Sequence, residues 1–286
     1  MGRVQDKVVF ITGAARGQGR SHALRLAAEG ADIIAVDLCA DIATNAYPLA
    51  TQDDLDETVR QVEKLGRRIV ARKADVRDPA ALKAAVADGV AELGRLDAVV
   101  AQAGIAPLGP QSAQAFIDAV TVDYVGVVHA VEAALPHLPD GASIVATGSI
   151  AALTPATVDN PANGPGGLGY SFAKRQVAAF VHDLATVLLP RRIRVNALHP
   201  TNVNTDMLHN DIMYRSFRPD LDSPTREDAM VSFPATTGMG NPYVEPEDVS
   251  DTVLFLVSDE SRYVTGMQMR VDAGGYVRKR PQLPTF

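Results

Sequence analysis

Residues 8–19 read Val8-Val9-Phe10-Ile11-Thr12-Gly13-Ala14-Ala15-Arg16-Gly17-Gln18-Gly19. In this stretch a short apolar run ends in a glycine-rich turn, and a helical pattern follows from about Gln18 to Glu29. Glycines in such a turn allow a tight bend, close approach of a pyrophosphate and close packing of the helix on the sheet. The phosphates would lie on the free amides at the positive end of the helix. Because strand, turn and helix occur in the order that a dinucleotide site requires, we favour such a site over an ordinary turn.

The next apolar run, from Asp32 to Val36, ends in Asp37. An acidic side chain about 20 residues beyond the glycine turn can accept hydrogen bonds from the ribose hydroxyls of adenosine. It would also repel a 2′-phosphate, which predicts NAD rather than NADP as the cofactor. Arg16 favours the opposite choice because a guanidinium pairs well with phosphate, but Leu38 offers no second cation. An NADP-dependent carbonyl reductase is therefore the alternative.

A tyrosine and a lysine stand one helical turn apart in Gly169-Tyr170-Ser171-Phe172-Ala173-Lys174. Residues i and i+4 share a helix face, so both side chains are expected to face one cleft. A phenol normally has a pKa near 10, and a cation held beside it favours the phenolate and lowers that pKa. The pair alone is a weak signal, but the nucleotide site and a strand-end serine, Ser149, accompany it.

Strand and helix patterns alternate along the chain without a break in composition. Apolar runs predict strands at 8–12, 33–36, 69–74, 98–101, 143–147, 193–198 and 267–271. Helical patterns lie near 18–29, 55–65, 79–92, 113–135, 170–189 and 246–256. This alternation predicts an α/β fold, a Rossmann-type, doubly wound, seven-stranded parallel sheet with helices on both faces. Ligands of such sheets bind outside the carboxyl ends of the strands. We expect residues 1–286 to form a single domain with its site at that edge.

The composition restricts the classes of function. The chain has 286 residues and a formal net charge of −7, which argues against a nucleic-acid or membrane-surface binder. Its one cysteine, Cys39, cannot form an internal disulfide, and the N-terminus does not read as a signal peptide, so a cytoplasmic location is expected. No apolar run approaches the roughly 20 residues that span a bilayer. The six histidines lack metal-ligand spacing, and we predict no metal site.

Together these motifs resemble the classical branch of the short-chain dehydrogenase/reductase family, from Val8 almost to the C-terminus. The matching segments are Thr12-Gly13-x-x-x-Gly17-x-Gly19, Asp75-Val76, Ala103-Gly104, Ser149, Tyr170-x-x-x-Lys174 and Val271-Asp272-Ala273-Gly274. More narrowly, residues 11–22, residues 33–37 and the insertion behind them are similar to the mycofactocin-coupled, carveol dehydrogenase-like subgroup. The resemblance implies an enzyme that uses NAD to interconvert a hydrophobic secondary alcohol and its ketone, with a mycofactocin electron acceptor as a partner.

The resemblance also implies roles for single residues. Tyr170 would exchange a proton with the substrate oxygen, Lys174 would lower the pKa of Tyr170 and hold the nicotinamide ribose, and Ser149 would hydrogen-bond the substrate oxygen. The alternative for Ser149 is a strand-end serine that satisfies backbone groups. A non-catalytic NAD(H)-binding interaction protein is a further possibility, against which these three intact residues argue. The residues expected to bind NAD are Gly13, Arg16, Gly17, Gln18, Gly19, Asp37, Asp75, Val76, Ala103, Gly104, Tyr170, Lys174, Pro200, Val203 and Thr205.

The chain departs from the family pattern at three places. Asp123, a fourth candidate catalytic residue, stands where the family often has an asparagine that supports a water relay to the lysine. A relay through the backbone carbonyl would tolerate aspartate. A relay through the amide would not, because the added charge favours the charged form of Lys174 and weakens its effect on Tyr170. A helix residue with only local hydrogen bonds is the third possibility. The other departures are Gln102 for asparagine and Thr201 for glycine.

Two insertions and one long connection are expected to shape the site. Residues 39–56 carry Tyr47, Pro48 and Leu49 and would lie beside the adenine end, and the subgroup resemblance implies that they cover NAD and slow its exchange. Residues 154–169 are rich in Gly, Pro and Asn, which predicts a loop at the substrate pocket. Each insertion could instead be a surface excursion. Residues 207–243 place methionines and aromatic residues among prolines, which predicts a substrate lid, with a packed pair of short helices as the alternative.

The expected helices at 113–135 and 170–189 are apolar beyond one narrow stripe, so more than one face of each is expected to be buried. The family commonly pairs these helices across two-fold axes. The resemblance therefore implies a homotetramer.

Overall fold

The central sheet is built from short strands whose sequences are continuous apolar runs. A computed structural model describes residues 2–155 and 157–278. In this part of the chain seven parallel strands follow the order β3-β2-β1-β4-β5-β6-β7. Because helices cover both faces of a parallel sheet, central strands such as β1, β4 and β5 are buried along their whole length. The strands are β1 (Val8–Thr12), β2 (Asp32–Asp37), β3 (Ile69–Lys73), β4 (Ala98–Ala101), β5 (Ser143–Thr147), β6 (Arg194–Pro200) and β7 (Gln268–Val271).

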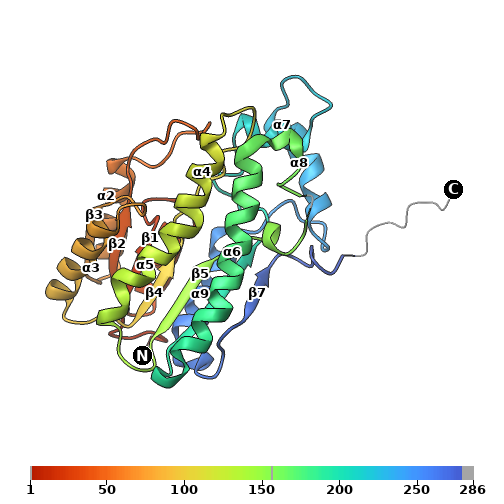
Figure 1. Cartoon of the computed structure of the whole chain (residues 1–286). Coiled ribbons are helices and arrows are strands. Elements are labelled where there is room, and N and C mark those ends of the chain that lie inside the picture. The colour runs from red at the N-terminus through yellow and green to blue at the C-terminus, as the bar shows by residue number, and fades with distance from the viewer. Residues whose placement is uncertain (1, 156, 279–286) are drawn as a thin grey trace.

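Helices cover the two faces of the sheet as separate layers, which Figure 1 shows from the side of α5 and α6. One hydrophobic core lies between the sheet and α3 (Pro79–Leu93), α5 (Gly126–Ala134) and α6 (Gly164–Leu188). The other lies between the sheet and α1 (Gly17–Ala28), α2 (Gln52–Lys64) and α9 (Pro246–Val257). The predicted doubly wound, seven-stranded α/β fold is therefore confirmed.

The strand order reverses at β1, which pairs with β2 on one side and with β4 on the other. At such a switch point the connections leave toward opposite faces, and a crevice opens outside the carboxyl ends of the strands. The glycine-rich turn after β1 and the segment after β4 form the two sides of this crevice. The fold thereby places the candidate site residues at one edge of the sheet.

The loop predicted at residues 154–169 is partly helical, because α6 begins at Gly164 rather than at Tyr170. The glycines at this end of α6 serve close packing. A Cβ on Gly166 would lie 1.8 Å from the carbonyl oxygen of Pro107, and a Cβ on Gly169 would lie 2.7 Å from that of Phe116. Gly and Pro here were therefore wrong signals for a loop, since Pro165 also suits the first turn of a helix.

The helix predicted at 113–135 is interrupted by a π-helical turn, Thr121–Val125, between α4 (Gln114–Val120) and α5. Such turns are rare and occur frequently at functional sites, and this one carries Asp123. By length and composition alone, the run Gln114–His137 is apolar enough to cross a membrane, but half of its most apolar window is buried in the fold. This degree of burial is expected of a helix that packs on the central sheet.

The predicted lid at residues 207–243 contains two short helices, α7 (Asp211–Phe217) and α8 (Arg226–Ser232). They share a small hydrophobic cluster around Tyr214, Ala229 and Phe233. The alternative of a packed pair of short helices is thus what the structure shows. The same segment also borders the candidate site, as described below.

Candidate active site

The glycine-rich turn between β1 and α1 has no room for a side chain at Gly13 or Gly19. Gly13 and Gly17 have φ angles of +67° and +54°, in the left-handed region that favours glycine. A Cβ on Gly13 would lie 2.8 Å from Cα of Ala103, and a Cβ on Gly19 would lie 1.9 Å from the carbonyl oxygen of Gly13. The first amides of α1 have no partners within the helix and are therefore available to an anion.

A groove of about 150 Å³ lies at this turn, and we call it the nucleotide groove. The predicted cofactor residues that line it are Gly13, Arg16, Gly17, Gln18, Gly19, Asp37, Asp75, Val76, Ala103, Gly104 and Thr205. These residues come from the ends of four strands and from the segment after β6. The glycine cradle and the acidic residue at the end of β2 fit the phosphates and the adenosine ribose of NAD.

Asp37 is tied to the glycine-rich turn by its own hydrogen bonds. Its carboxylate accepts the backbone N–H of Ala15 at 3.0 Å and that of Cys39 at 3.1 Å. Burial raises the pKa of Asp37, while these hydrogen bonds and the charge of Arg16 act in the opposite direction. Asp75 is engaged in a different way, because Arg77 pairs with its carboxylate at 2.6 Å. The ion pair holds the pKa of Asp75 below its ordinary value despite partial burial.

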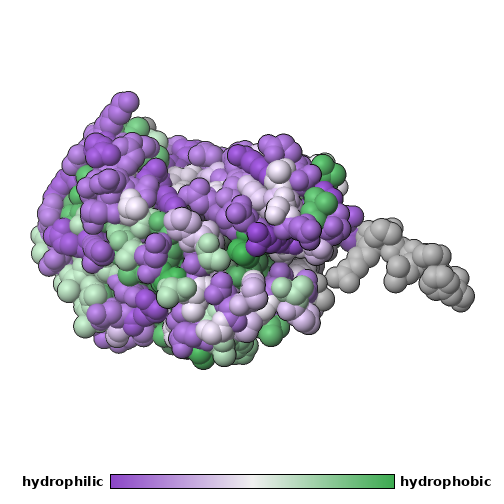
Figure 2. All heavy atoms as spheres, turned by 90° about the horizontal axis from the view of Figure 1, so that it is seen from above, coloured by the Kyte–Doolittle hydropathy of each residue, from purple (hydrophilic) through white to green (hydrophobic). Residues whose placement is uncertain are grey.

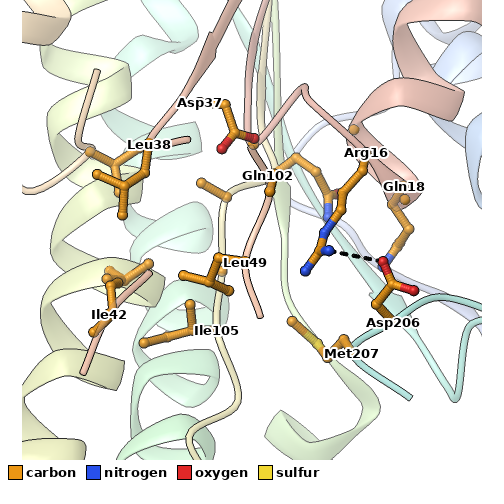
Figure 3. Close-up of a pocket in the computed structure, with 18 of the residues that line it drawn as sticks. Arg16, Gln18, Asp37, Leu38, Ile42, Leu49, Gln102, Ile105, Asp206 and Met207 are labelled. Atoms are coloured by element: carbon orange, nitrogen blue, oxygen red, sulfur yellow. Dashed lines mark ion pairs between the residues drawn. The ribbon is translucent and has the colours of Figure 1, made fainter. Parts of the chain in front are cut away.

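Arg16 crosses the nucleotide groove and joins two other segments (Figure 3). Its guanidinium pairs with Asp206 at 3.0 Å and donates a hydrogen bond to the carbonyl oxygen of Pro48. Pro48 belongs to the insertion after β2, and Asp206 stands at the start of the lid segment. The side chain of Arg16 is therefore paired with protein groups on both sides of the nucleotide groove.

The insertion after β2 reaches the opposite wall of the groove. Tyr47 is buried, and its hydroxyl accepts the backbone N–H of Ala106 at 3.3 Å. Thr44 donates to the carboxylate of Asp118 at 2.6 Å. The prediction that residues 39–56 lie beside the adenine end was too narrow, because these contacts bring the insertion across to the segment after β4 and to α4. Its C-terminal residues are helical, since α2 begins at Gln52.

A larger cavity of about 680 Å³ adjoins the nucleotide groove, and we call it the substrate cavity. Ser149, Tyr170 and Lys174 line it, as do Pro200 and Val203. Apolar lid side chains complete the wall, namely Met207, Leu208, Met213 and Phe217. Figure 2 looks down on the molecule from above and shows apolar side chains among the hydrophilic ones in the middle of this face. The two spaces share Gln18, Gln102, Gly104, Thr205 and Met207.

Tyr170 and Ser149 come from different elements and meet at the substrate cavity. Ser149 follows β5, and Tyr170 lies in the second turn of α6. Burial raises the pKa of Tyr170 to about 12, the hydrogen bond with Ser149 lowers it, and the charge of Asp123 raises it. The phenol is thus a proton donor at neutral pH. Nζ of Lys174 lies 5.6 Å from the ring centroid of Tyr170, and a lowering of this pKa by Lys174 stays a prediction.

Lys174 and Asp123 converge on Gly104. A Cβ on Gly104 would lie 2.8 Å from Oδ1 of Asp123 and 3.4 Å from Nζ of Lys174. Lys174 is buried and donates to the carbonyl oxygen of Thr147 at 3.0 Å, and its pKa is lowered by burial. Glycine at position 104 therefore allows both charged groups to approach the groove.

Asp123 makes a hydrogen bond outside its own helix. Its Oδ1 atom accepts the backbone N–H of Ile105 at 2.7 Å, and its buried Oδ2 atom has no partner among the described residues. Burial raises the pKa of Asp123 to about 7, which the charge of Lys174 and the Ile105 bond partly oppose. The interpretation of Asp123 as a helix residue with only local hydrogen bonds is thus wrong, while both relay alternatives stay predictions.

Sequence reasoning missed a buried polar network behind the groove. The amide oxygen of Gln102 lies 2.5 Å from the Thr147 hydroxyl and 3.1 Å from Nε2 of His22. Ser250 lies 2.7 Å from Nδ1 of the same ring, and burial lowers the pKa of His22 to about 4. The amide oxygen of Gln102 therefore pairs with a histidine that is neutral at neutral pH. The only signal of this network in the sequence was Gln102, a longer polar side chain at the position where the family often has asparagine.

The described residues contain no group of three His, Cys, Asp or Glu side chains that could hold a metal ion.

Comparisons with known proteins agree with this arrangement. A family model described as enoyl-(acyl carrier protein) reductase, of the short-chain alcohol dehydrogenase type, matches residues 13–276. The chain is 46% identical over 282 residues to the (−)-trans-carveol dehydrogenase of Rhodococcus erythropolis, covering 96% of this chain and 99% of the relative. The chain belongs to the short-chain dehydrogenase/reductase family, as its sequence predicted.

Solved structures place the chain near the carveol dehydrogenases within that family. The carveol dehydrogenase of Mycobacterium avium, solved with NAD, is 46% identical and superposes with a TM-score of 0.91, covering 97% of this chain and 100% of that one. A short-chain dehydrogenase of Mycobacterium paratuberculosis bound to NAD is 40% identical, with a TM-score of 0.85 and coverage of 96% and 100%.

Proposed function

We propose that this chain is an NAD-dependent oxidoreductase that interconverts a hydrophobic secondary alcohol and its ketone. One observation carries the proposal: Ser149, Tyr170 and Lys174 line a cavity that also carries apolar side chains and adjoins a groove fitted to a dinucleotide. The prediction of an NAD-dependent enzyme is confirmed by the family and by the NAD complexes of its relatives. The name of the R. erythropolis relative supports carveol and similar cyclic alcohols as substrates.

Each residue has a physical task in this reaction. Bound nicotinamide supplies or accepts the hydride. The Ser149 hydroxyl holds the substrate oxygen and stabilises charge that develops on it. Tyr170 donates its phenol proton to that oxygen during ketone reduction, and its phenolate accepts the alcohol proton during oxidation. Lys174 holds a positive charge at the junction of cavity and groove, beside the position expected for the nicotinamide ribose.

The two alternative functions have less support. An NADP-dependent carbonyl reductase would need a cation for the 2′-phosphate, whereas Arg16 is paired with Asp206 and Asp37 faces the groove. A non-catalytic NAD(H)-binding protein would not require Ser149, Tyr170 and Lys174 around one cavity.

Cofactor choice is tested at Asp37. We expect Asp37→Ala to shift the affinity ratio toward NADP by roughly 10- to 100-fold, because it removes a like charge that opposes the 2′-phosphate. Alanine also frees the Ala15 and Cys39 amides, so Asp37→Asn serves as the matched variant that retains an acceptor. Titration of cofactor-free protein with NAD and NADP measures the ratio. An unchanged ratio in both variants would move the selectivity to Arg16.

Slow cofactor exchange is a finer part of the proposal. The contacts of the insertion with Arg16, Ala106 and Asp118 support a cover over bound NAD. We therefore expect excess free NAD to give one stoichiometric burst of oxidation, with steady turnover only after an artificial electron acceptor is added. In the cell a mycofactocin-type acceptor would take this role. Sustained turnover on free NAD alone would return the protein to the freely exchanging dehydrogenases.

A homotetramer is proposed from apolar side chains that stay exposed on two parts of the surface. One set lies on α4 and α6 and consists of Ile117, Leu168 and Phe172. The other consists of Leu189, which follows the end of α6, and Met267, which precedes β7. Light scattering should give four times the chain mass of 30.3 kDa. Phe172→Glu should lower that mass, whereas Val231→Glu on exposed α8 should not. A monomeric parent at micromolar concentration would reject the proposal.

A further inference from the structure

His199 lies directly beneath the backbone of Ser149. It is the penultimate residue of β6 and is fully buried. A Cβ on Gly148 would lie only 2.4 Å from Cε1 of the ring, so glycine lets the end of β5 rest on it. Nδ1 of His199 lies 3.2 Å from the backbone nitrogen of Ser149 and 2.9 Å from its carbonyl oxygen. The ring therefore contacts the backbone of a predicted catalytic residue without lining the substrate cavity itself.

Gln268 on β7 determines which ring nitrogen carries the proton. Its Nε2 atom donates to the carbonyl oxygen of Ala178 on α6 at 3.0 Å, so its Oε1 atom is the one that faces His199. The distance from Oε1 to Nε2 of His199 is 2.7 Å. Because a carbonyl oxygen only accepts, Nε2 of His199 must donate. The tautomer is thus set by a contact on the far side of the ring from Ser149.

The charge state of His199 then assigns the bond to Ser149. Burial lowers the pKa of His199, as do the charges of Lys174 and Arg270, while the hydrogen bonds with Gln268 and Ser149 raise it. With the proton on Nε2, Nδ1 has a free lone pair and accepts the Ser149 N–H. A protonated ring would donate from Nδ1 to the Ser149 carbonyl oxygen instead. Whether neutral or protonated, the ring of His199 contacts the backbone of Ser149.

We propose that His199 and Gln268 form a buried brace between the backbone of Ser149 and α6, and that His199 is a positioning residue for the reaction. Ser149 belongs to the end of β5, whereas Tyr170 and Lys174 belong to α6. The brace connects these elements through Ala178, which lies one helical turn beyond Lys174 on α6. A misplacement of about 1 Å at a reacting group costs up to roughly 100-fold in rate. The inference rests on the proposed function for the role of Ser149.

Two substitutions separate the contacts of His199. Asparagine places a polar atom near the position of Nδ1, and glutamine places one near that of Nε2. We expect His199→Gln to lower kcat for oxidation of (−)-trans-carveol, measured with an artificial electron acceptor present, by roughly 10- to 100-fold with little change in KM or in NADH affinity. His199→Asn should restore part of that loss, because it keeps the contact with Ser149 and loses only the contact with Gln268. His182→Gln, an exposed histidine on α6, is the matched control and should behave as the parent.

Equal loss or equal retention of kcat in the Asn and Gln variants would overturn the brace. If the parent protein oxidises no alcohol, the proposed function is overturned instead. Hydrogen exchange of the Ser149 amide, followed by NMR, then decides the brace without any turnover. Protection in the parent and in His199→Asn, with faster exchange in His199→Gln, supports it. The same exchange rate in all three proteins contradicts it, and thermal unfolding shows whether each variant is folded.

Discussion

Replacing Tyr170 by phenylalanine should lower the rate of alcohol oxidation by about 10²- to 10⁴-fold, the usual range for a lost general acid or base. The substitution removes the hydroxyl that exchanges a proton with the substrate oxygen and keeps the ring that lines the substrate cavity. Binding of NADH should change little, because the nucleotide groove is lined by other residues. The loss should therefore appear in the chemical step, measured as a single-turnover rate with excess alcohol.

The matched control for Tyr170 is Tyr263→Phe. Tyr263 is 89% exposed and lies away from both the groove and the cavity, so its hydroxyl should not matter. Activity of the Tyr170 variant within a few-fold of the parent would contradict the role of Tyr170. Equal losses in both variants would also contradict it, because the effect would then not be specific to the cavity.

Gly19→Ala should abolish NAD binding, with a loss of affinity of at least about 100-fold. The added Cβ would lie 1.9 Å from the carbonyl oxygen of Gly13, and a backbone atom cannot rotate away as a flexible side chain can. The turn and the start of α1 must shift, and the amides that would hold the phosphates shift with them. Titration of cofactor-free protein with NAD, followed by calorimetry, measures the loss.

The control for Gly19 lies on the same helix. Ala28 is exposed in the last turn of α1, and Ala28→Ser should leave NAD affinity and thermal unfolding close to the parent. NAD affinity of the Gly19 variant within a few-fold of the parent would show that the dinucleotide does not rest on this turn. A variant that unfolds at a lower temperature but binds NAD normally would contradict the account in the same way.

The sheet could be predicted because its strands are buried on both faces. Val8–Thr12 and Ser143–Thr147 read as short apolar runs between turn signals, and the structure gives the same bounds. The order of strand, glycine-rich turn and helix also located the nucleotide groove, since local sequence determines local backbone there. Ser149, Tyr170 and Lys174 could be placed on the carboxyl edge for the same reason.

Contacts between distant segments could not be predicted from the sequence. Nothing near Tyr47 indicates that its hydroxyl reaches the amide of Ala106, and nothing near Arg16 indicates a pairing with Asp206. The glycines at the start of α6 resembled loop residues because their role is close packing against Pro107 and Phe116, which depends on tertiary structure. The π-helical turn at Asp123 likewise follows from packing rather than from local propensity.

Burial opposes the pKa shift that the spacing of Tyr170 and Lys174 predicts. From spacing alone, a lysine one turn from a tyrosine lowers the pKa of the phenol. In the folded chain the desolvation of Tyr170 dominates and raises its pKa, and Asp123 adds to the rise. Desolvation also lowers the pKa of Lys174. The balance among these buried groups depends on distances and on solvent exclusion that only the fold determines.

The most direct test of the proposed function is a product assay with matched cofactors. The parent protein is mixed with NAD or NADP and with a panel of cyclic secondary alcohols that includes (−)-trans-carveol, and both reduced cofactor and ketone are quantified. We predict that at least one alcohol gives ketone and NADH in equal amounts, at least one equivalent per chain, with far less product from NADP. Absence of ketone from every alcohol with NAD, or ketone formed only with NADP, would contradict the account.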